Sequence, residues 1–309
     1  MRRRILITGV NGFVGRHLVS ALKTVGDEIV GVDIGHDAAW EMDRYYGCDL
    51  AKADAVRKIM SDERPDAVIH LAAVSSVAQS WKAPVESFLN NTSIFLNVVE
   101  SVRVLGLQTR ILSVGSSEEY GNIPGDEVPI EENRPLAPAN PYAVARVSQE
   151  QLSRLYAEGF GLDVVMTRSF NQIGPGQRTD FVVPSFLHQL KKGKDAGQEK
   201  VTVQVGDLSV VRDFMDVRDT VAAYLLLIER GVAGEVYNVC SGVGRRLSEV
   251  LETAARIAGV DVNVEVDPQR MRPVDNKVIV GSNEKMRGLG WQLEYTLEES
   301  MRDMFLSLG

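Results

Sequence analysis

The first half of the chain alternates short apolar runs with longer amphipathic stretches, and this alternation restricts the fold more than any other feature. Runs such as "RILITG", "EIVGVD", "DAVIHLAA" and "RILSVGSS" have the length and composition of buried strands. Between them, "FVGRHLVSALKTV" and "PVESFLNNTSIFLNVVESVRVLG" have helical character. Strands and helices that take turns in this way build a parallel sheet covered on both faces. The sequence therefore predicts an α/β fold with a doubly wound parallel sheet.

Three glycines follow the first strand-like run at G-x-x-G-x-x-G spacing, in "ITGVNGFVGRHL". Gly9, Gly12 and Gly15 let the chain turn tightly and bring backbone N–H groups close to a pyrophosphate at a helix start. The next strand-like run ends at Asp33, where an acid accepts hydrogen bonds from the adenosine ribose and repels a 2′-phosphate. We expect a Rossmann-type site that prefers NAD(H), with NADP(H) as the alternative. Asp49 either lies near the adenine or caps a helix.

The regular alternation loosens beyond about residue 170, where loops lengthen and basic residues gather in "GPGQRTD", "KKGKDAGQEK" and "RMRPVDNK". We expect a dinucleotide-binding domain over residues 1–170 and a smaller substrate lobe over residues 171–309. Strands and helices around residues 208–240 are expected to return to the first domain, because lobes of this kind often exchange strands.

The composition argues against several other classes of protein. The chain has 44% hydrophobic residues and a formal net charge of −8, without the basic character of a nucleic-acid-binding protein. No stretch approaches the roughly 18–20 uninterrupted apolar residues of a membrane span. Cys48 and Cys240 lie far apart and the four histidines show no ligand spacing. We therefore expect a cytoplasmic protein with no nucleic-acid partner, no membrane contact and no metal.

Several further motifs together resemble the extended short-chain dehydrogenase/reductase superfamily that acts on nucleotide sugars. They cover nearly the whole chain: "TGVNGFVG", "HLAA", "GSSEEYG", "NPYAVAR", "RSFNQIGPGQ", "VRDFMDVRD" and "YNVCSG". Within that superfamily, "SFNQIGPGQ", "VVRDFMDVRD" and "YNVCSG" look most like the GDP-4-keto-6-deoxy-D-mannose reductases. The resemblance implies NAD(P)H-dependent reduction of the C4 keto group of a GDP-linked 4-keto-6-deoxyhexose. A GDP-mannose 4,6-dehydratase, another nucleotide-sugar epimerase and a catalytically impaired NAD-binding protein remain as alternatives.

The resemblance also assigns the reaction centre. Tyr142 matches the superfamily's proton-transferring tyrosine, and Ser116 matches the hydroxyl that holds the sugar's C4 oxygen. Asn140 and Pro141 read as the N-cap and first residue of a helix, whose positive end favours the phenolate form of Tyr142. Glu118 stands where the dehydratases keep a proton-abstracting glutamate, although a structural carboxylate is an equally good interpretation.

The cation that follows Tyr142 departs from the superfamily pattern. Arg146 replaces a lysine that hydrogen-bonds the nicotinamide ribose and places positive charge beside the phenol. Residues four apart share one face of a helix, so arginine keeps the charge near Tyr142. Its planar fork has different donor geometry and does not deprotonate. A natural variant that retains activity, an engineered substitution and a protein that binds without turnover all remain open.

The remaining assignments also rest on the resemblance. The expected cofactor contacts are Gly9, Asn11, Gly12, Phe13, Val14, Gly15, Asp33, Asp49, Leu50, Leu71, Ala72, Ala73, Tyr142 and Arg146. The expected substrate contacts are Ser75, Ser116, Ser117, Glu118, Asn171, Arg212 and Arg272. For Arg212 and Arg272, a surface salt bridge is the alternative to a diphosphate contact. Helices near residues 85–104 and 142–158 are expected to form a homodimer interface, as is usual in the superfamily.

Overall fold

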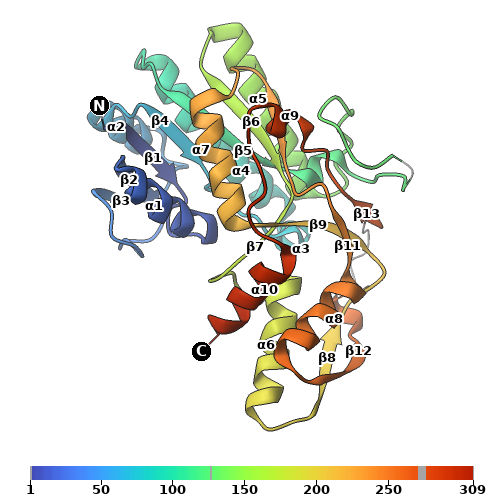
Figure 1. The fold of residues 1–309 in the computed structure, drawn as a ribbon. Helices are drawn as coiled ribbons and strands as arrows, with labels where there is room; N and C mark the ends of the chain where they lie inside the picture. The colour runs from blue at the N-terminus through green and yellow to red at the C-terminus, as the bar shows by residue number, and fades with distance from the viewer. Residues whose placement is uncertain (1, 126, 271–275, 309) are drawn as a thin grey trace.

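The computed structural model describes residues 2–125, 127–270 and 276–308, and a seven-stranded sheet lies at its centre (Figure 1). The strands are β1 (Arg4–Thr8), β2 (Glu28–Asp33), β3 (Arg44–Gly47), β4 (Ala67–His70), β5 (Arg110–Ser116), β6 (Val164–Ser169) and β10 (Val236–Val239). Their order is β10-β6-β5-β4-β1-β2-β3, and every neighbouring pair is parallel. The predicted doubly wound α/β fold is confirmed.

Helices cover both faces of this sheet (Figure 1). One apolar core joins the sheet to α1 (Phe13–Val25), α7 (Val217–Arg230) and α9 (Glu284–Gly288). A second core joins the opposite face to α2 (Ala53–Glu63), α4 (Pro84–Val104) and α5 (Pro141–Phe160). Apart from the edge strand β3, the strands are buried from both sides, which explains why their sequences are largely continuous apolar runs rather than alternating ones. Two short elements, α3 (Val77–Lys82) and η1 (Ser117–Tyr120), follow β4 and β5.

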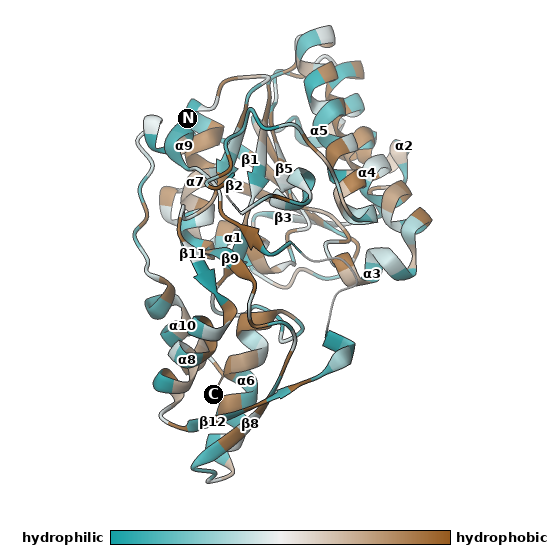
Figure 2. Ribbon diagram, turned by 90° about the vertical axis from the view of Figure 1, so that its right-hand side faces the viewer, coloured by the Kyte–Doolittle hydropathy of each residue, from teal (hydrophilic) through white to brown (hydrophobic). Residues whose placement is uncertain are grey.

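A smaller lobe with its own apolar core lies beside the carboxyl ends of the strands (Figure 2). It contains α6 (Val182–Asp195), β8 (Lys200–Val205), α8 (Leu247–Ala258), β12 (Asp261–Val266) and α10 (Leu297–Leu306). A small sheet links the lobes through β7 (Asn171–Ile173), β9 (Val211–Asp216), β11 (Gly244–Arg246) and β13 (Val278–Ile279), and η2 (Pro268–Arg270) precedes β13. Within the described ranges, no helix has the length and apolarity needed to cross a bilayer.

Helix α5 carries the predicted reaction centre, and its position is fixed at several points. Asn140 caps its start by accepting a hydrogen bond from a backbone N–H, Pro141 is its first residue, and Gly161 ends it in the left-handed conformation. Further along, the Glu150 carboxylate pairs with Arg168 of β6, with both N···O distances at 2.8 Å. Both side chains are 3% exposed, so this ion pair ties the helix to the interior of the sheet.

Breaking this ion pair should strongly destabilise the fold. Glu150→Ala leaves the Arg168 guanidinium buried without its carboxylate, and we expect the free energy of unfolding to fall by about 3–5 kcal/mol. Arg154→Ala removes a partly exposed guanidinium from the same carboxylate and should cost about 1 kcal/mol or less. Urea unfolding of both variants measures the difference. An equally small cost for both would contradict the role given to the buried pair.

Candidate active site

The turn between β1 and α1 has the geometry of a phosphate-binding cradle. Gly9 has a φ of +71°, and a Cβ there would lie 2.8 Å from the backbone nitrogen of Ala72. A Cβ on Gly15 would lie 2.2 Å from the carbonyl oxygen of Val10, so the helix can pack this closely only with glycine. Helix α1 starts at Gly12 without a side-chain cap. Its first backbone N–H groups therefore suit an anionic ligand such as a pyrophosphate.

Asp33 lies at the carboxyl end of β2 and is tied to the same turn. Its Oδ2 accepts a hydrogen bond from the backbone N–H of Asn11 at 2.9 Å, and its Oδ1 accepts one from Ile34 at 2.8 Å. The Asn11 side chain in turn donates to the Tyr45 hydroxyl at 3.1 Å. A carboxylate has about four lone-pair sites, so acceptor capacity for ribose hydroxyls remains.

Asp49 and Leu50 follow β3. The Asp49 carboxylate accepts a hydrogen bond from the backbone N–H of Ala51 at 3.0 Å, whereas the N-cap of α2 is Lys52. The interpretation of Asp49 as a helix cap is therefore wrong, because the helix starts later than its sequence suggests. The Leu50 side chain is buried in the core that joins α2 and α4 to the sheet.

The other predicted cofactor residues surround the glycine turn. Phe13 and Val14 form the first turn of α1, and Phe13 contacts His17 edge-to-face at a centroid distance of 5.5 Å. Residues 71–73 directly follow β4, and the Ala72 N–H donates to the Thr8 hydroxyl at 3.2 Å. The adjacent ends of β1 and β4 thus bring the glycine turn and residues 71–73 together.

His70, the last residue of β4, is completely buried behind this turn. Its Nδ1 lies 2.9 Å from the Thr8 hydroxyl, and its ring contacts Phe95 edge-to-face. Burial lowers the pKa of His70 to about 3, and the positive charge of Arg146 contributes to this shift. The imidazole is therefore neutral in the folded protein over the physiological range.

The reaction-centre residues predicted from sequence meet at the end of β5. Ser116 ends that strand, Tyr142 lies in the first turn of α5, and both hydroxyl-bearing side chains line one large cavity. Arg146 Nε donates a hydrogen bond to the Tyr142 hydroxyl at 3.1 Å, and the guanidinium carbon lies 5.3 Å from the phenol ring centroid. A permanent cation one helical turn after the tyrosine therefore touches the phenol directly.

Sequence reasoning missed the residue that holds this cation. Arg146 is 4% exposed, and its Nη1 donates to the Val114 carbonyl at 3.1 Å and to Gln149 Oε1 at 2.6 Å. Gln149 lies three residues further along α5, on the same helix face. That spacing is the only sequence signal for the contact, and it is shared by many surface pairs.

The short helix η1 places three adjacent residues in different environments. Ser117 is buried and lines the cavity. Glu118 also lines it, and its Oε2 accepts a hydrogen bond from the Asn140 side chain at 2.8 Å. The neighbouring Glu119 is fully buried, and its Oε1 accepts a hydrogen bond from the Ser116 backbone N–H at 2.7 Å. Burial, together with the charge of Glu150, raises the pKa of Glu119 to about 8.

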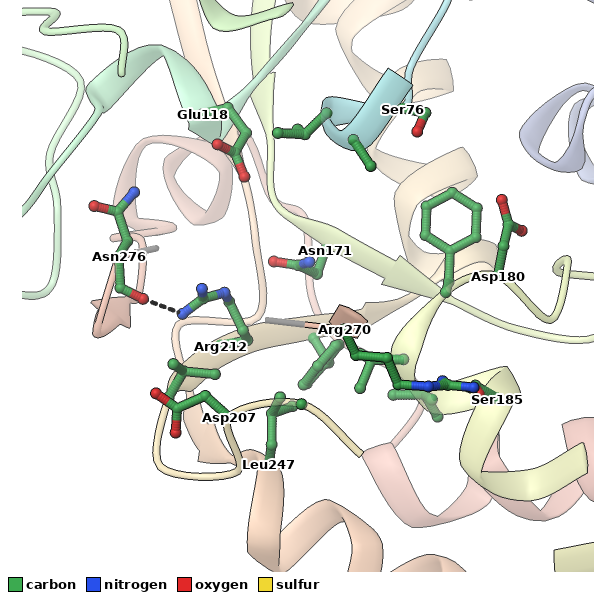
Figure 3. A pocket seen from close by; sticks show the side chains of 18 of the residues that line it. Ser76, Glu118, Asn171, Asp180, Ser185, Asp207, Arg212, Leu247, Arg270 and Asn276 are labelled. Atoms are coloured by element: carbon green, nitrogen blue, oxygen red, sulfur yellow. Dashed lines mark hydrogen bonds between the residues drawn. The ribbon is translucent and has the colours of Figure 1, made fainter. Parts of the chain in front are cut away.

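A cavity of about 1100 Å³ separates the reaction centre from the smaller lobe, and Figure 3 shows some of its lining residues. Ser75 and Asn171 line it, as predicted for substrate contacts. Arg212 of β9 also lines it and is 7% exposed, with Nη1 donating to the Asn276 carbonyl at 2.7 Å. Its side chain is therefore buried at the cavity wall and not on the outer surface, and the diphosphate contact stays a prediction. Arg272 lies outside the described residues.

Arg270 is a second cavity-lining arginine, which sequence reasoning missed. Its Nη1 donates to the Ser185 hydroxyl of α6 at 3.1 Å, and its Nε lies 3.4 Å from Asp267. The basic loop that contains it was visible in the sequence, but its position against α6 depends on the tertiary fold. Among the described residues, no group of His, Cys, Asp and Glu side chains has an arrangement that could hold a metal ion.

Comparison with known proteins agrees with this geometry. A family model described as GDP-mannose 4,6 dehydratase matches residues 6–304. The chain belongs to this family. The assignment to the nucleotide-sugar enzymes of the extended short-chain dehydrogenase/reductase type is thereby confirmed.

Individual relatives and solved structures resemble the chain over almost its full length. The GDP-6-deoxy-D-mannose reductase of Pseudomonas aeruginosa is 35% identical over 303 residues, which cover 98% of this chain and 96% of the relative. The solved structure of RMD from P. aeruginosa complexed with NADPH has a TM-score of 0.87 at 33% identity, covering 99% and 98% of the two chains. The Thermus thermophilus UDP-glucose 4-epimerase complex with NAD has a TM-score of 0.87 at 29% identity, covering 98% of each chain.

The buried His70 should make folding stability depend on pH. In the unfolded chain its imidazole takes up a proton below about pH 6.5, whereas in the folded protein it stays neutral down to about pH 3. Because the unfolded state then binds more protons, the free energy of unfolding falls as pH falls through this window, by about 1.4 kcal/mol per unit. Urea unfolding at about pH 6.5 and about pH 5 should show that the wild type loses about 1–2 kcal/mol more than His70→Asn. Identical losses would mean that His70 binds a proton in the folded protein.

Proposed function

We propose that the protein is an NAD(P)H-dependent nucleotide-sugar reductase that converts GDP-4-keto-6-deoxy-D-mannose to GDP-D-rhamnose (GDP-6-deoxy-D-mannose). The observation that carries this proposal is the pairing of Ser116 and Tyr142 at one wall of the large cavity, with the Arg146 guanidinium bonded to the phenol. The whole-length similarity to a GDP-6-deoxy-D-mannose reductase supports the choice of substrate.

The contacts of Tyr142 suit a proton donor. Arg146 Nε–H is a donor only, so the phenol oxygen accepts this hydrogen bond and its own proton points elsewhere. In the reaction, Tyr142 gives that proton to the C4 oxygen, which Ser116 holds by a hydrogen bond. A bound reduced nicotinamide supplies the hydride. The phenolate that remains faces the guanidinium, which stabilises its charge.

The substrate's diphosphate is assigned to the cavity wall formed by the smaller lobe. Arg212 and Arg270 line this wall, and planar guanidinium groups suit phosphate oxygens. Asn171, which opens β7, lines the same cavity. In Figure 3, Arg212 and Glu118 approach the same space from different elements. The guanine base is proposed from the similarity to GDP-sugar enzymes.

The cofactor is proposed to be a nicotinamide dinucleotide, with NAD(H) preferred. Of two similar solved structures, one holds NADPH and the other NAD. This supports a nicotinamide dinucleotide but not the preference for NAD(H). The preference rests on Asp33, whose carboxylate lies beside the glycine turn and would repel a 2′-phosphate. The open start of α1 at Gly12 would hold the pyrophosphate.

A GDP-mannose 4,6-dehydratase is the second candidate. The observation in its favour is Glu118, which lines the cavity beside Ser116 and Tyr142 and could remove a proton from C5. A dehydratase returns its hydride to the same sugar, so it consumes no reduced cofactor overall. A reductase consumes one reduced cofactor for each sugar.

The stoichiometry of the reaction therefore tests the proposed function. With GDP-4-keto-6-deoxy-D-mannose and either NADH or NADPH, we expect one nicotinamide to be oxidised per sugar, with the lower KM for NADH. NMR of the product gives the C4 configuration. Tyr142→Phe should reduce kcat at least about 100-fold, because the proton donor is lost, while the dissociation constant for NADH changes little.

Three results would contradict this function. Conversion of GDP-mannose to the keto sugar without added reduced cofactor would favour the dehydratase. Wild-type turnover in Tyr142→Phe would remove the phenol from the reaction. If the protein binds the cofactor but oxidises no nicotinamide with any keto sugar, it is a cofactor-binding protein without this activity.

We also propose a homodimer that forms through α4 and α5. These two helices pack side by side, and their outer faces carry exposed apolar side chains. Val85 and Leu89 of α4 are 70% and 57% exposed, and Leu155 of α5 is 55% exposed. A set of apolar residues on adjacent helices is typical of a surface that another protein covers.

A charge on this surface should dissociate the dimer. We expect Leu89→Asp to shift the mass measured by light scattering from two chains to one, because an unpaired carboxylate is costly in an apolar interface. Val25→Asp is the matched control, since Val25 is 61% exposed at the end of α1 on the other side of the sheet. A wild-type protein with the mass of a single chain would refute the dimer.

A further inference from the structure

We propose that Gln149 is a positioning residue that aims the Arg146 guanidinium at Tyr142, so that arginine can act where the superfamily motif has lysine. This inference rests on the proposed function for its kinetic consequences. It concerns the orientation of the Arg146 guanidinium, which affects both the contact with Tyr142 and the N–H groups available to the cofactor.

The side-chain amide of Gln149 is held in one orientation. It is 1% exposed, and its Nε2 donates to the Ser113 hydroxyl at 2.9 Å and to the Val114 carbonyl at 3.2 Å. A carbonyl oxygen only accepts hydrogen bonds, so the amide nitrogen must face Val114. The amide oxygen consequently faces Arg146, which only donates, and the two atoms lie 2.6 Å apart.

This anchored oxygen fixes the plane of the guanidinium. Nη1 of Arg146 is held between the Val114 carbonyl and Gln149, while Nε faces the Tyr142 hydroxyl. Nη2 donates to none of the described residues, and it is not fully buried. Its two N–H groups are therefore the ones available to the hydroxyls of a nicotinamide ribose.

Arginine needs such an anchor more than lysine does. An ammonium group is a compact charge whose three N–H bonds rotate toward any nearby acceptor. A guanidinium is a rigid planar fork, so a rotation about its stem moves Nε away from the phenol and Nη2 away from the ribose together. Loss of the Gln149 acceptor should therefore impair proton transfer and cofactor binding at the same time.

Other ionisable groups also face Arg146, and their protonation bears on the choice of assay pH. They are Tyr142 of α5, His70 of β4, Glu119 of η1 and Tyr224 of α7. Burial lowers the pKa of His70 to about 3 and raises that of Tyr224 to about 12, so both stay neutral near pH 8. Burial and Glu150 raise the pKa of Glu119 to about 8, so the measurements are repeated in a Glu119→Gln background, where this residue carries no charge.

A double-mutant cycle tests the proposal. Gln149→Leu and Gln149→Met are each made in the wild-type chain and in the Arg146→Lys variant, and the methionine variant keeps the side-chain length if leucine disturbs folding. The readouts are kcat for the keto sugar and the dissociation constant for NADH, measured from nicotinamide fluorescence without sugar. In the wild-type chain, which carries Arg146, we expect each Gln149 substitution to lower kcat about tenfold or more and to weaken NADH binding about threefold or more. In the Arg146→Lys background the same changes should stay within about twofold.

Ser153→Ala is the matched control. It removes a buried hydrogen bond to Ser113 from the same network without touching Arg146. It should lower the melting temperature but leave kcat and the dissociation constant for NADH within about twofold of the wild type.

Equal effects of the Gln149 substitutions beside arginine and lysine would overturn the proposal, because they would show that Gln149 acts through packing alone. A loss of kcat and NADH binding in Ser153→Ala as large as in the Gln149 variants would also overturn it. If no variant, wild type included, reduces the keto sugar, the proposed function fails, and the NADH-binding cycle still decides whether Gln149 acts through Arg146.

Discussion

Every neighbouring pair of strands in the central sheet is parallel, and the rest of the molecule depends on that constraint. Parallel strands all end at the same edge, so residues separated by more than a hundred positions in sequence meet there. Gly9 follows β1, Asp33 ends β2, His70 ends β4 and Ser116 ends β5. The smaller lobe completes this edge with the arginine-lined wall of the cavity. The site is thus a consequence of strand direction as much as of side-chain identity.

Buried charge on the reaction-centre side of the sheet keeps α5 in register with these strand ends. Burial alone would raise the pKa of Glu150, but the hydrogen bonds and charge of Arg168 outweigh it and lower the pKa. The carboxylate therefore stays ionised against its partner on β6. Glu119 has the opposite balance and bonds the Ser116 backbone as a buried group with a raised pKa. The Glu119 carboxyl group thus positions Ser116, and the Glu150 carboxylate fixes α5 to β6.

Much of this arrangement could be predicted from the sequence, because its signals are local. The glycine spacing, Asp33 at a strand end and the Asn140–Pro141 start of α5 each depend on a few adjacent residues and their backbone geometry. The helix-cap alternative for Asp49 failed for a local reason as well, since the N-cap position of α2 is Lys52, three residues later. Gln149 and Arg270 escaped prediction because the contacts that position them come from distant elements, Ser113 and Val114 of β5 for Gln149 and Ser185 of α6 for Arg270. No spacing along the chain encodes those distances.

The arginine at position 146 also constrains how Tyr142 regains its proton after the proposed reduction. A guanidinium gives up no proton in proteins, and behind it lie the Val114 carbonyl and the Gln149 amide, neither of which is an acid. The direct hydrogen-bond partners of Arg146 on its buried side therefore offer the phenol no proton, whereas the phenol itself lines the cavity. In the proposed reaction the substrate occupies the same wall of the cavity. Return of the proton from the cavity would link reprotonation of Tyr142 to departure of the product, a coupling that a lysine relay would not impose.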